Sequence, residues 1–76
     1  MKTPLRLARE RRSLTIVQVS ASTGVDPGNL SRIERGSQTP SKDVAEKLAK
    51  FFGHDVTEIQ IIYPERYMTA IPAEAA

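Results

Sequence analysis

The sequence predicts an all-α protein in which five short helices form one compact domain. Signals for a helix start, in which a hydroxyl or carboxyl side chain can cap the first amides, recur along the 76 residues. Between these signals, apolar residues recur at three- and four-residue spacing, which is the repeat of a helix with one buried face. The five Leu, six Ile, five Val and two Phe side chains are enough for one small helical core.

The first two helices each follow a threonine. Thr3 can cap the first helix, and Pro4 at its first position loses no hydrogen bond, so this helix should run to about Arg12. Thr15 can cap a second helix over residues 16–23, although the β-branched side chains in this segment lower its helix propensity. Packing against the rest of the core must therefore stabilise the second helix.

A glycine turn links the second helix to a third one. Gly24 is the residue best able to adopt the left-handed conformation that ends a helix. Asp26 and Pro27 then repeat the combination of cap and proline, so a third helix should run to Arg35 and stop at Gly36. The residues expected to face inward are Val19, Ser20, Val25, Leu30 and Ile33. A helix, a tight bend and a second helix with this spacing predict a helix-turn-helix.

Two further helices complete the predicted domain. Ser41 can cap a fourth helix that ends at Gly53, and Asp55 can cap a fifth helix over residues 56–62, which Pro64 prevents from extending far. The apolar stripe of the fourth helix consists of Val44, Ala45, Leu48, Phe51 and Phe52. We therefore expect a domain over residues 1–63 and a C-terminal extension over residues 64–76, with a disordered end.

Composition limits the classes of protein to which the chain can belong. It has no cysteine, so neither a disulfide framework nor a thiolate zinc site can hold the fold together, and a reducing compartment fits best. No apolar stretch has the length of a secretion signal or of a membrane span. We therefore expect a cytoplasmic protein that does not bind a membrane.

Catalytic and metal-binding patterns are absent from the sequence. The chain has one histidine, no glycine-rich phosphate loop and no paired carboxylates at a catalytic spacing. Asp43 and Glu46 lie one turn apart but lack a third metal ligand, and His54 sits in a turn that ends a helix. We expect no enzyme, no metal, no cofactor and no small-molecule ligand.

Charge is distributed unevenly along the chain, whose net charge is +2. Residues 1–42 carry eight basic and three acidic side chains, whereas residues 43–76 carry three basic and six acidic ones. Such a polarised chain suits an anionic polymer on its basic side. The alternative for the basic run within the first twelve residues is a solvated helix face.

Several short motifs occur together at a characteristic spacing: Leu14-Thr15, Gly24-Val25-Asp26, the run from Leu30 to Gly36 that ends in Glu-Arg-Gly, Pro40-Ser41, Leu48-Ala49-Lys50 and Phe52-Gly53. With these motifs, residues 5–59 resemble the phage repressor and Cro family of helix-turn-helix regulators, also called XRE-like. The resemblance implies a compact five-helix, lambda-repressor-like DNA-binding domain, in agreement with the elements derived above from caps and periodicity.

The resemblance implies that the third helix enters the major groove of operator DNA, which is wide enough to admit one helix. The base-reading positions then fall on Pro27, Gly28, Asn29, Ser31 and Arg32. Proline and glycine have no side-chain hydrogen-bonding group, so they offer only shape, apolar contact or close backbone approach. Arg32 is the main candidate, because its planar guanidinium can bind O6 and N7 of guanine together.

Phosphate contacts are implied on both sides of the third helix in the chain, at Thr15, Ile16, Val17, Arg35, Ser37, Gln38 and Lys42. The family commonly has glutamine where this chain has Ile16, so one side-chain contact is missing. By resemblance, Arg9 forms a structural ion pair with Glu34. The alternative is that Arg9 is an independent surface residue.

One small module makes few contacts with DNA, so we expect a symmetric homodimer, at least on DNA, that binds two half-sites roughly 34 Å apart. Its expected surface consists of Ile59, Ile61, Ile62, Tyr63, Tyr67, Met68 and Ile71. Residues 67–71 could form a helix or pair as a strand with the second copy. The alternative is that Ile59 and Ile62 complete the core.

The expected function is that of a transcriptional repressor from a phage or prophage that binds double-stranded operator DNA. The alternative is an antitoxin-like regulator with the same fold, whose main role is to bind a protein partner.

Overall fold

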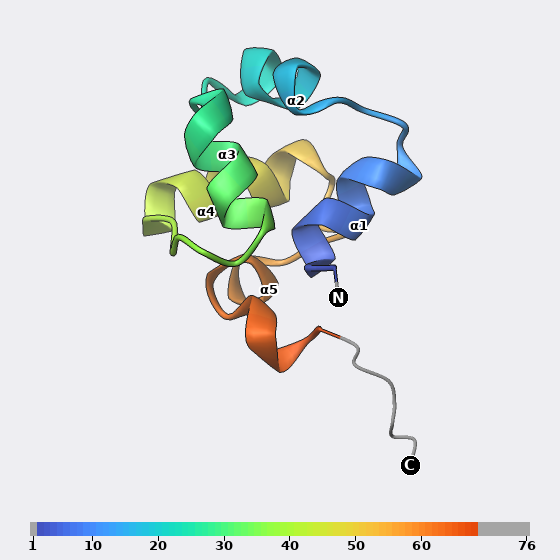
Figure 1. The fold of residues 1–76 in the computed structure, drawn as a ribbon. Coiled ribbons are helices and arrows are strands. Elements are labelled where there is room, and N and C mark those ends of the chain that lie inside the picture. Colours follow the sequence, from blue (N-terminus) through green and yellow to red (C-terminus); the bar gives the residue numbers. More distant parts are fainter. Residues whose placement is uncertain (1, 69–76) are drawn as a thin grey trace.

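The computed structural model describes residues 2–68, and its regular elements in this part of the chain are all helical (Figure 1). They are α1 (Pro4–Arg11), α2 (Ile16–Thr23), α3 (Pro27–Glu34), α4 (Lys42–Phe51), α5 (Glu58–Ile62) and a short 3-10 helix, η1 (Pro64–Arg66). The prediction of an all-α fold with five helices is confirmed. Ile71 and the C-terminal end, for which we expected disorder, lie outside the described residues.

The first four helices begin at the caps that the sequence predicts. In each case the hydroxyl or carboxyl oxygen of the cap accepts a hydrogen bond from the amide three residues later, and the caps are Thr3, Thr15, Asp26 and Ser41. At the other end of α2, Gly24 has a φ of 77°, which is the left-handed conformation that glycine adopts without strain.

The start of α5 differs from the prediction, and Asp55 as its cap is wrong. The cap is Thr57, whose hydroxyl accepts from the Gln60 amide while the Thr57 amide donates to the Gln60 side chain. This reciprocal capping box satisfies two amides at once, whereas one aspartate would satisfy a single amide. Asp55 instead accepts a hydrogen bond of 2.8 Å from Arg12.

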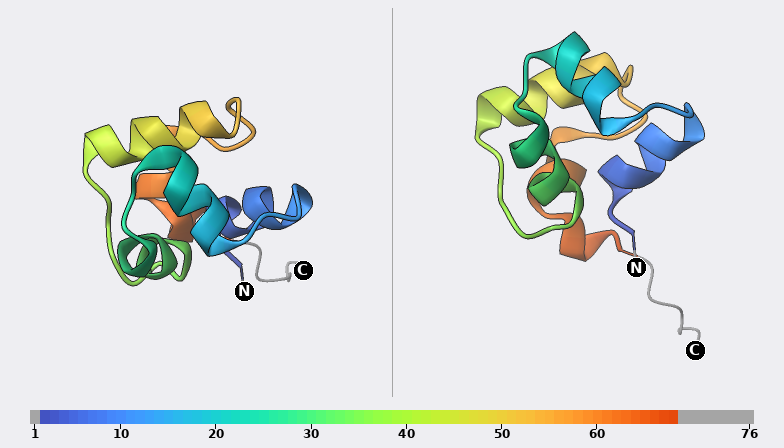
Figure 2. Two further views of the ribbon diagram at one scale, coloured as in Figure 1. Left: turned by 90° about the horizontal axis from the view of Figure 1, so that it is seen from above. Right: turned by 45° about the horizontal axis from the view of Figure 1, so that its top comes forward.

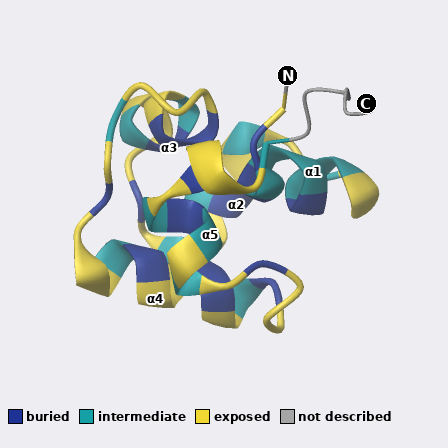
Figure 3. Ribbon diagram, turned by 90° about the horizontal axis from the view of Figure 1, so that it is seen from below, coloured by how far each residue is buried: buried dark blue, intermediate teal, exposed yellow. Residues whose placement is uncertain are grey.

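The core lies where the five helices meet. α4 packs against α5 and α2, α2 packs against α3, and α1 packs against α5, so that the buried residues of the helices face one interior (Figures 2 and 3). The largest side chains enclosed there are Phe52, Leu5, Leu30, Leu48, Ile61, Val19 and Val56. This core fixes the position of α3 relative to the rest of the molecule.

Ile61 belongs to this core, with 2% of its surface exposed. Its assignment to an outward apolar surface is therefore wrong, because α5 turns this side chain inward. Tyr67 and Met68 lie in no strand, and the rest of the segment 67–71 is outside the described residues. Over the described part of the chain, none of the helices is both long enough and apolar enough to cross a membrane.

Candidate nucleic-acid interface

The turn between α2 and α3 is held by side chains of α2. The Ser20 hydroxyl donates to the Val25 carbonyl over 2.5 Å, and the Val25 amide donates to the Thr23 hydroxyl over 3.3 Å. Val25 itself is buried, as is Leu30 in the middle of α3. These bonds and the apolar contacts fix the angle between the two helices, which is the requirement for a helix-turn-helix.

The five expected base-reading residues all lie on α3, and the remaining side chains of this helix anchor it. Leu30, Ile33 and Glu34 are buried. Exposed surface belongs to Pro27, Gly28 and Arg32, while Asn29 and Ser31 are half-buried. The outer face of α3 therefore has little side-chain volume and no polar side chain at its start, at Pro27 and Gly28, and it has polar side chains farther along the helix.

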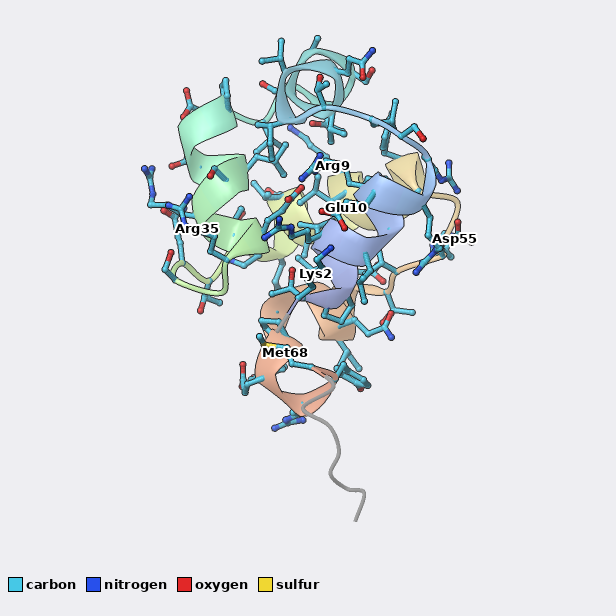
Figure 4. The ribbon with its side chains drawn as sticks, turned by 45° about the vertical axis from the view of Figure 1, so that its right-hand side comes forward. Lys2, Arg9, Glu10, Arg35, Asp55 and Met68 are labelled. Atoms are coloured by element: carbon cyan, nitrogen blue, oxygen red, sulfur yellow. The ribbon has the colours of Figure 1, made fainter. Side chains whose placement is uncertain are left out.

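Hydrogen bonds order the polar part of this face. Arg32 donates from its Nε to Gln38 Oε1 over 2.8 Å and from a terminal nitrogen to Asn29 Oδ1. Arg35 donates to the Ser31 hydroxyl over 2.6 Å, and its side chain points outward from the α3 side of the molecule (Figure 4). Both arginines thus bond to neutral groups and keep their positive charge uncompensated by these partners.

The loop after α3 continues the same surface. Gly36 has a φ of 76°, and the Ser37 amide and hydroxyl both donate to the Arg32 carbonyl, over 3.0 and 3.2 Å. Arg35, Ser37 and Lys42 are exposed, and Gln38 is half-buried. The expected phosphate contacts that follow α3 therefore lie in one ordered loop and the start of α4.

The start of α2 carries the other expected phosphate contacts. Thr15 caps the helix by accepting a hydrogen bond from the Gln18 amide, and the Thr15 amide donates to Gln18 Oε1 over 2.8 Å. The amides of Ile16 and Val17 are in the first helical turn and have no acceptor within the helix, so they can bind an anion. Gln18 is not among the predicted contacts, although Thr-x-x-Gln is a capping-box pattern that the sequence contains.

An ion pair joins α1 to the end of α3. Arg9 Nε lies 2.6 Å from Glu34 Oε2, and the exposed fractions of the two side chains are 15% and 4%. Arg9 also donates to the Leu14 carbonyl over 2.7 Å, and the buried Thr3 hydroxyl donates to the Glu34 carbonyl over 2.6 Å. The hydrogen bond that Arg9 donates to Glu34 raises the pKa of Arg9 above its ordinary value. Arg9 and Thr3 thereby hold the end of α3 in place.

Most cations of the N-terminal basic run form ion pairs within the chain. Glu10 accepts hydrogen bonds from both Lys2 and Arg6, of which the bond from Lys2 contributes most to lowering the pKa of Glu10. Arg12 pairs with Asp55, on the side of the molecule away from Arg35 (Figure 4). Apart from Arg11, this run is therefore paired within the chain, whereas Arg32 on α3 and Arg35 directly after it form no ion pair among the described residues.

A second surface feature is apolar and lies on α5 and η1. Ile59 is 54% exposed, and Tyr63 and Tyr67 are each 43% exposed. Ile62 and Met68 are half-buried beside them. In Figure 1, α5 lies at the opposite end of the molecule from α2, so this apolar surface leaves the start of α2 uncovered.

Within residues 2–68, no group of three or more His, Cys, Asp or Glu side chains could hold a metal ion.

Comparison with known proteins agrees with this geometry. A family model described as helix-turn-helix matches residues 5–59. An uncharacterised HTH-type transcriptional regulator of Methanocaldococcus jannaschii is 36% identical over 61 residues, which cover 80% of this chain and 92% of that relative. No solved structure gives a significant match. The chain belongs to the XRE-like helix-turn-helix family of DNA-binding transcriptional regulators.

Proposed function

We propose that this protein is a repressor that binds double-stranded operator DNA as a homodimer, with α3 of each subunit in the major groove. The observation that carries the proposal is the outer face of α3. It combines a start without polar side chains, at Pro27 and Gly28, with two arginines, Arg32 and Arg35, that form no ion pair among the described residues. Because the residues at its start are small, the helix can approach the base edges closely, and the arginines attract the phosphates.

Base reading is assigned first to Arg32, which is exposed and can donate two parallel hydrogen bonds to guanine. Asn29 and Ser31 stand on the same helix and can donate to neighbouring base edges. Pro27 and Gly28 contribute close contact, for example with a thymine methyl group, and no hydrogen bonds from side chains.

Phosphate binding is assigned to two places that lie on either side of α3 in the chain. At the start of α2, the amides of Ile16 and Val17 next to the cap Thr15 can donate to one phosphate. After α3, the second place consists of three exposed residues and the half-buried Gln38. The exposed residues are Arg35, Ser37 and Lys42. Contacts of this kind orient the helix in the groove without reading sequence.

Dimerisation is assigned to the apolar surface of α5 and η1. Ile59, Tyr63 and Tyr67 are exposed outside the core, and the half-buried Ile62 and Met68 extend this apolar surface. Two copies joined there would give a two-fold symmetric protein, and such a dimer binds two half-sites about one helical turn apart.

Selection of binding sites from random duplex DNA tests this function. We expect wild-type protein to enrich a two-fold symmetric site with a guanine in each half. The variant Arg32→Ala should lose the preference for that guanine, because the fork that reads it is removed. Arg11→Ala is the matched control, since it removes an exposed arginine of α1 and should enrich the wild-type site.

Enrichment of no site by the wild-type protein would contradict the proposed function. The loss of the same guanine preference in Arg11→Ala would contradict the assignment of base reading to α3.

A further inference from the structure

We propose that Gln38 and Asn29 are positioning residues that hold the Arg32 guanidinium in one orientation, with its outer edge presented to a guanine. The inference rests on the proposed function, because it concerns how the same face of α3 would read DNA. The three residues come from two elements, since Asn29 and Arg32 lie on α3 and Gln38 lies in the loop that follows.

The hydrogen bonds of Arg32 determine which of its edges can meet a base. A guanidinium has five N–H groups. The Nε–H donates to Gln38, and one terminal nitrogen donates to Asn29. Three N–H groups therefore remain, and each terminal nitrogen keeps at least one. Guanine O6 and N7 match a pair of donors on the two terminal nitrogens, so Arg32 meets guanine with its outer edge while Gln38 retains the Nε–H.

The glycine at position 28 leaves room for this arrangement. A Cβ atom added to Gly28 would lie 3.5 Å from one terminal nitrogen of Arg32 and 3.1 Å from Oδ2 of the cap Asp26. The guanidinium thus lies over the first turn of α3, where a longer side chain at position 28 would stand. Gly28 has no side chain that could bond to DNA, and the space that a side chain would fill is taken by the Arg32 guanidinium.

Holding the Arg32 guanidinium in place before DNA binds changes both the affinity for DNA and the selectivity among bases. An arginine side chain loses conformational freedom when it is fixed against a base, and a side chain that is already ordered loses less. A held guanidinium also cannot turn easily toward a base with a different arrangement of acceptors. Loss of Gln38 should therefore weaken discrimination at the base pair that Arg32 reads, whereas loss of a phosphate contact would weaken binding to every sequence equally.

A double-mutant cycle on DNA tests the inference. The probes are the duplex selected by wild-type protein and its three variants at the base pair that Arg32 reads. The proteins are wild type, Gln38→Ala, Arg32→Ala and the double variant, and the measured quantity is the ratio of the dissociation constants for the other bases to that for guanine. Thr39→Ala is the matched control, because it changes an exposed side chain in the same loop.

We expect Gln38→Ala to lower this ratio by about threefold to tenfold, which corresponds to one lost hydrogen bond between side chains. In the Arg32→Ala background the same change should alter the ratio by less than about twofold, because Gln38 acts through Arg32. Thr39→Ala should leave the ratio unchanged. Gln38→Glu keeps the acceptor oxygen, so it should retain the ratio even though its negative charge near phosphates weakens binding to all probes.

Three results would overturn the inference. Equal weakening on all four probes by Gln38→Ala would make Gln38 a phosphate contact alone. An undiminished effect of Gln38→Ala in the Arg32→Ala background would show that Gln38 reads the base directly. Failure of the wild-type protein to select any duplex would instead remove the proposed function and the positioning role together.

Discussion

Five arginines of this protein fall into two groups according to their partners. Arg6, Arg9 and Arg12 pair with carboxylates inside the chain, whereas Arg32 and Arg35 bond to neutral side chains on the surface that α3 presents. The sequence shows eight basic residues in its first 42 positions but cannot show which of them are already neutralised. That distinction depends on which acidic groups the fold brings near, such as Asp55 beside Arg12.

Burial decides how much each of these ion pairs contributes to stability. Arg9→Ala removes a pair in which Glu34 is 4% exposed, and the uncompensated carboxylate should lower the free energy of unfolding by about 3 kcal/mol. Arg6→Ala removes an exposed pair one turn earlier on α1, and its effect should stay below about 1 kcal/mol. Urea unfolding followed by circular dichroism measures both values. Equal losses in the two variants would refute the structural role of the Arg9–Glu34 pair.

The pair of Arg12 and Asp55 should make stability depend on pH. The hydrogen bond from Arg12 lowers the pKa of Asp55 in the folded protein below its ordinary value of 3.8. Ionised Asp55 therefore stabilises the fold above that value, and the contribution is lost as the pH falls through the folded-state pKa. The difference in unfolding free energy between wild type and Asp55→Asn should be present at neutral pH and disappear in acid. In an Arg12→Ala background, Asp55→Asn should have little effect at either pH, and a difference that persists there would contradict this cause.

At the scale of elements, the sequence predicts the helices whose boundaries depend on local chemistry. Thr3, Thr15, Asp26 and Ser41 cap helices where expected, because each cap bonds an amide only three residues away. The start of α5 was placed two residues too early, because Asp55 and Thr57 are both good caps and only the reciprocal bond with Gln60 distinguishes them.

The candidate site could be predicted less completely than the helices. The resemblance implies which positions of α3 face outward, and local spacing supports them. The bond between Arg32 and Gln38 could not be predicted, since it requires the path of the loop after α3. Likewise, the inward turn of Ile61 depends on how α5 packs against α1 and α4.

The cap of α5 gives a prediction for that element. Thr57→Ala removes the hydroxyl that accepts from the Gln60 amide, and we expect it to lower the free energy of unfolding by about 1 kcal/mol. Thr57→Asp restores an acceptor at the same place and should recover most of that loss. Thermal unfolding of the three proteins checks this, and an unchanged melting temperature in Thr57→Ala would show that the cap contributes nothing.

At the scale of the whole molecule, charge and apolar surface lie on different elements. Arg32 and Arg35, which form no ion pair among the described residues, lie on α3 and directly after it, whereas three of the four large apolar side chains that are exposed, Ile59, Tyr63 and Tyr67, lie on or beside α5 and η1. The fourth, Val17, lies on α2. This separation allows one surface to meet DNA while the other meets a second copy of the chain, as the proposed repressor requires.

Dimerisation through α5 predicts a difference between whole and half operators. Ile59→Asp places a charge on a side chain that is 54% exposed, so the fold should persist while the apolar surface is interrupted. Binding to a duplex with two half-sites should weaken by about tenfold or more, because the second subunit no longer adds its contacts. Binding to a duplex with one half-site should not change. Equal weakening on both duplexes would place Ile59 outside a dimer contact.

The central claim is that α3 and the loop after it bind DNA in a sequence-dependent way. Fluorescence anisotropy of the selected duplex and of random duplex, titrated with wild-type protein over a salt series, tests it most directly. We expect tight binding to the selected site. The logarithm of its association constant should fall with the logarithm of the salt concentration at a slope between about −3 and −6, because each subunit makes a few phosphate contacts. We also expect much weaker binding to random duplex, with a comparable sensitivity to salt. Equal affinity for the two duplexes, or affinity that does not depend on salt, would contradict the account.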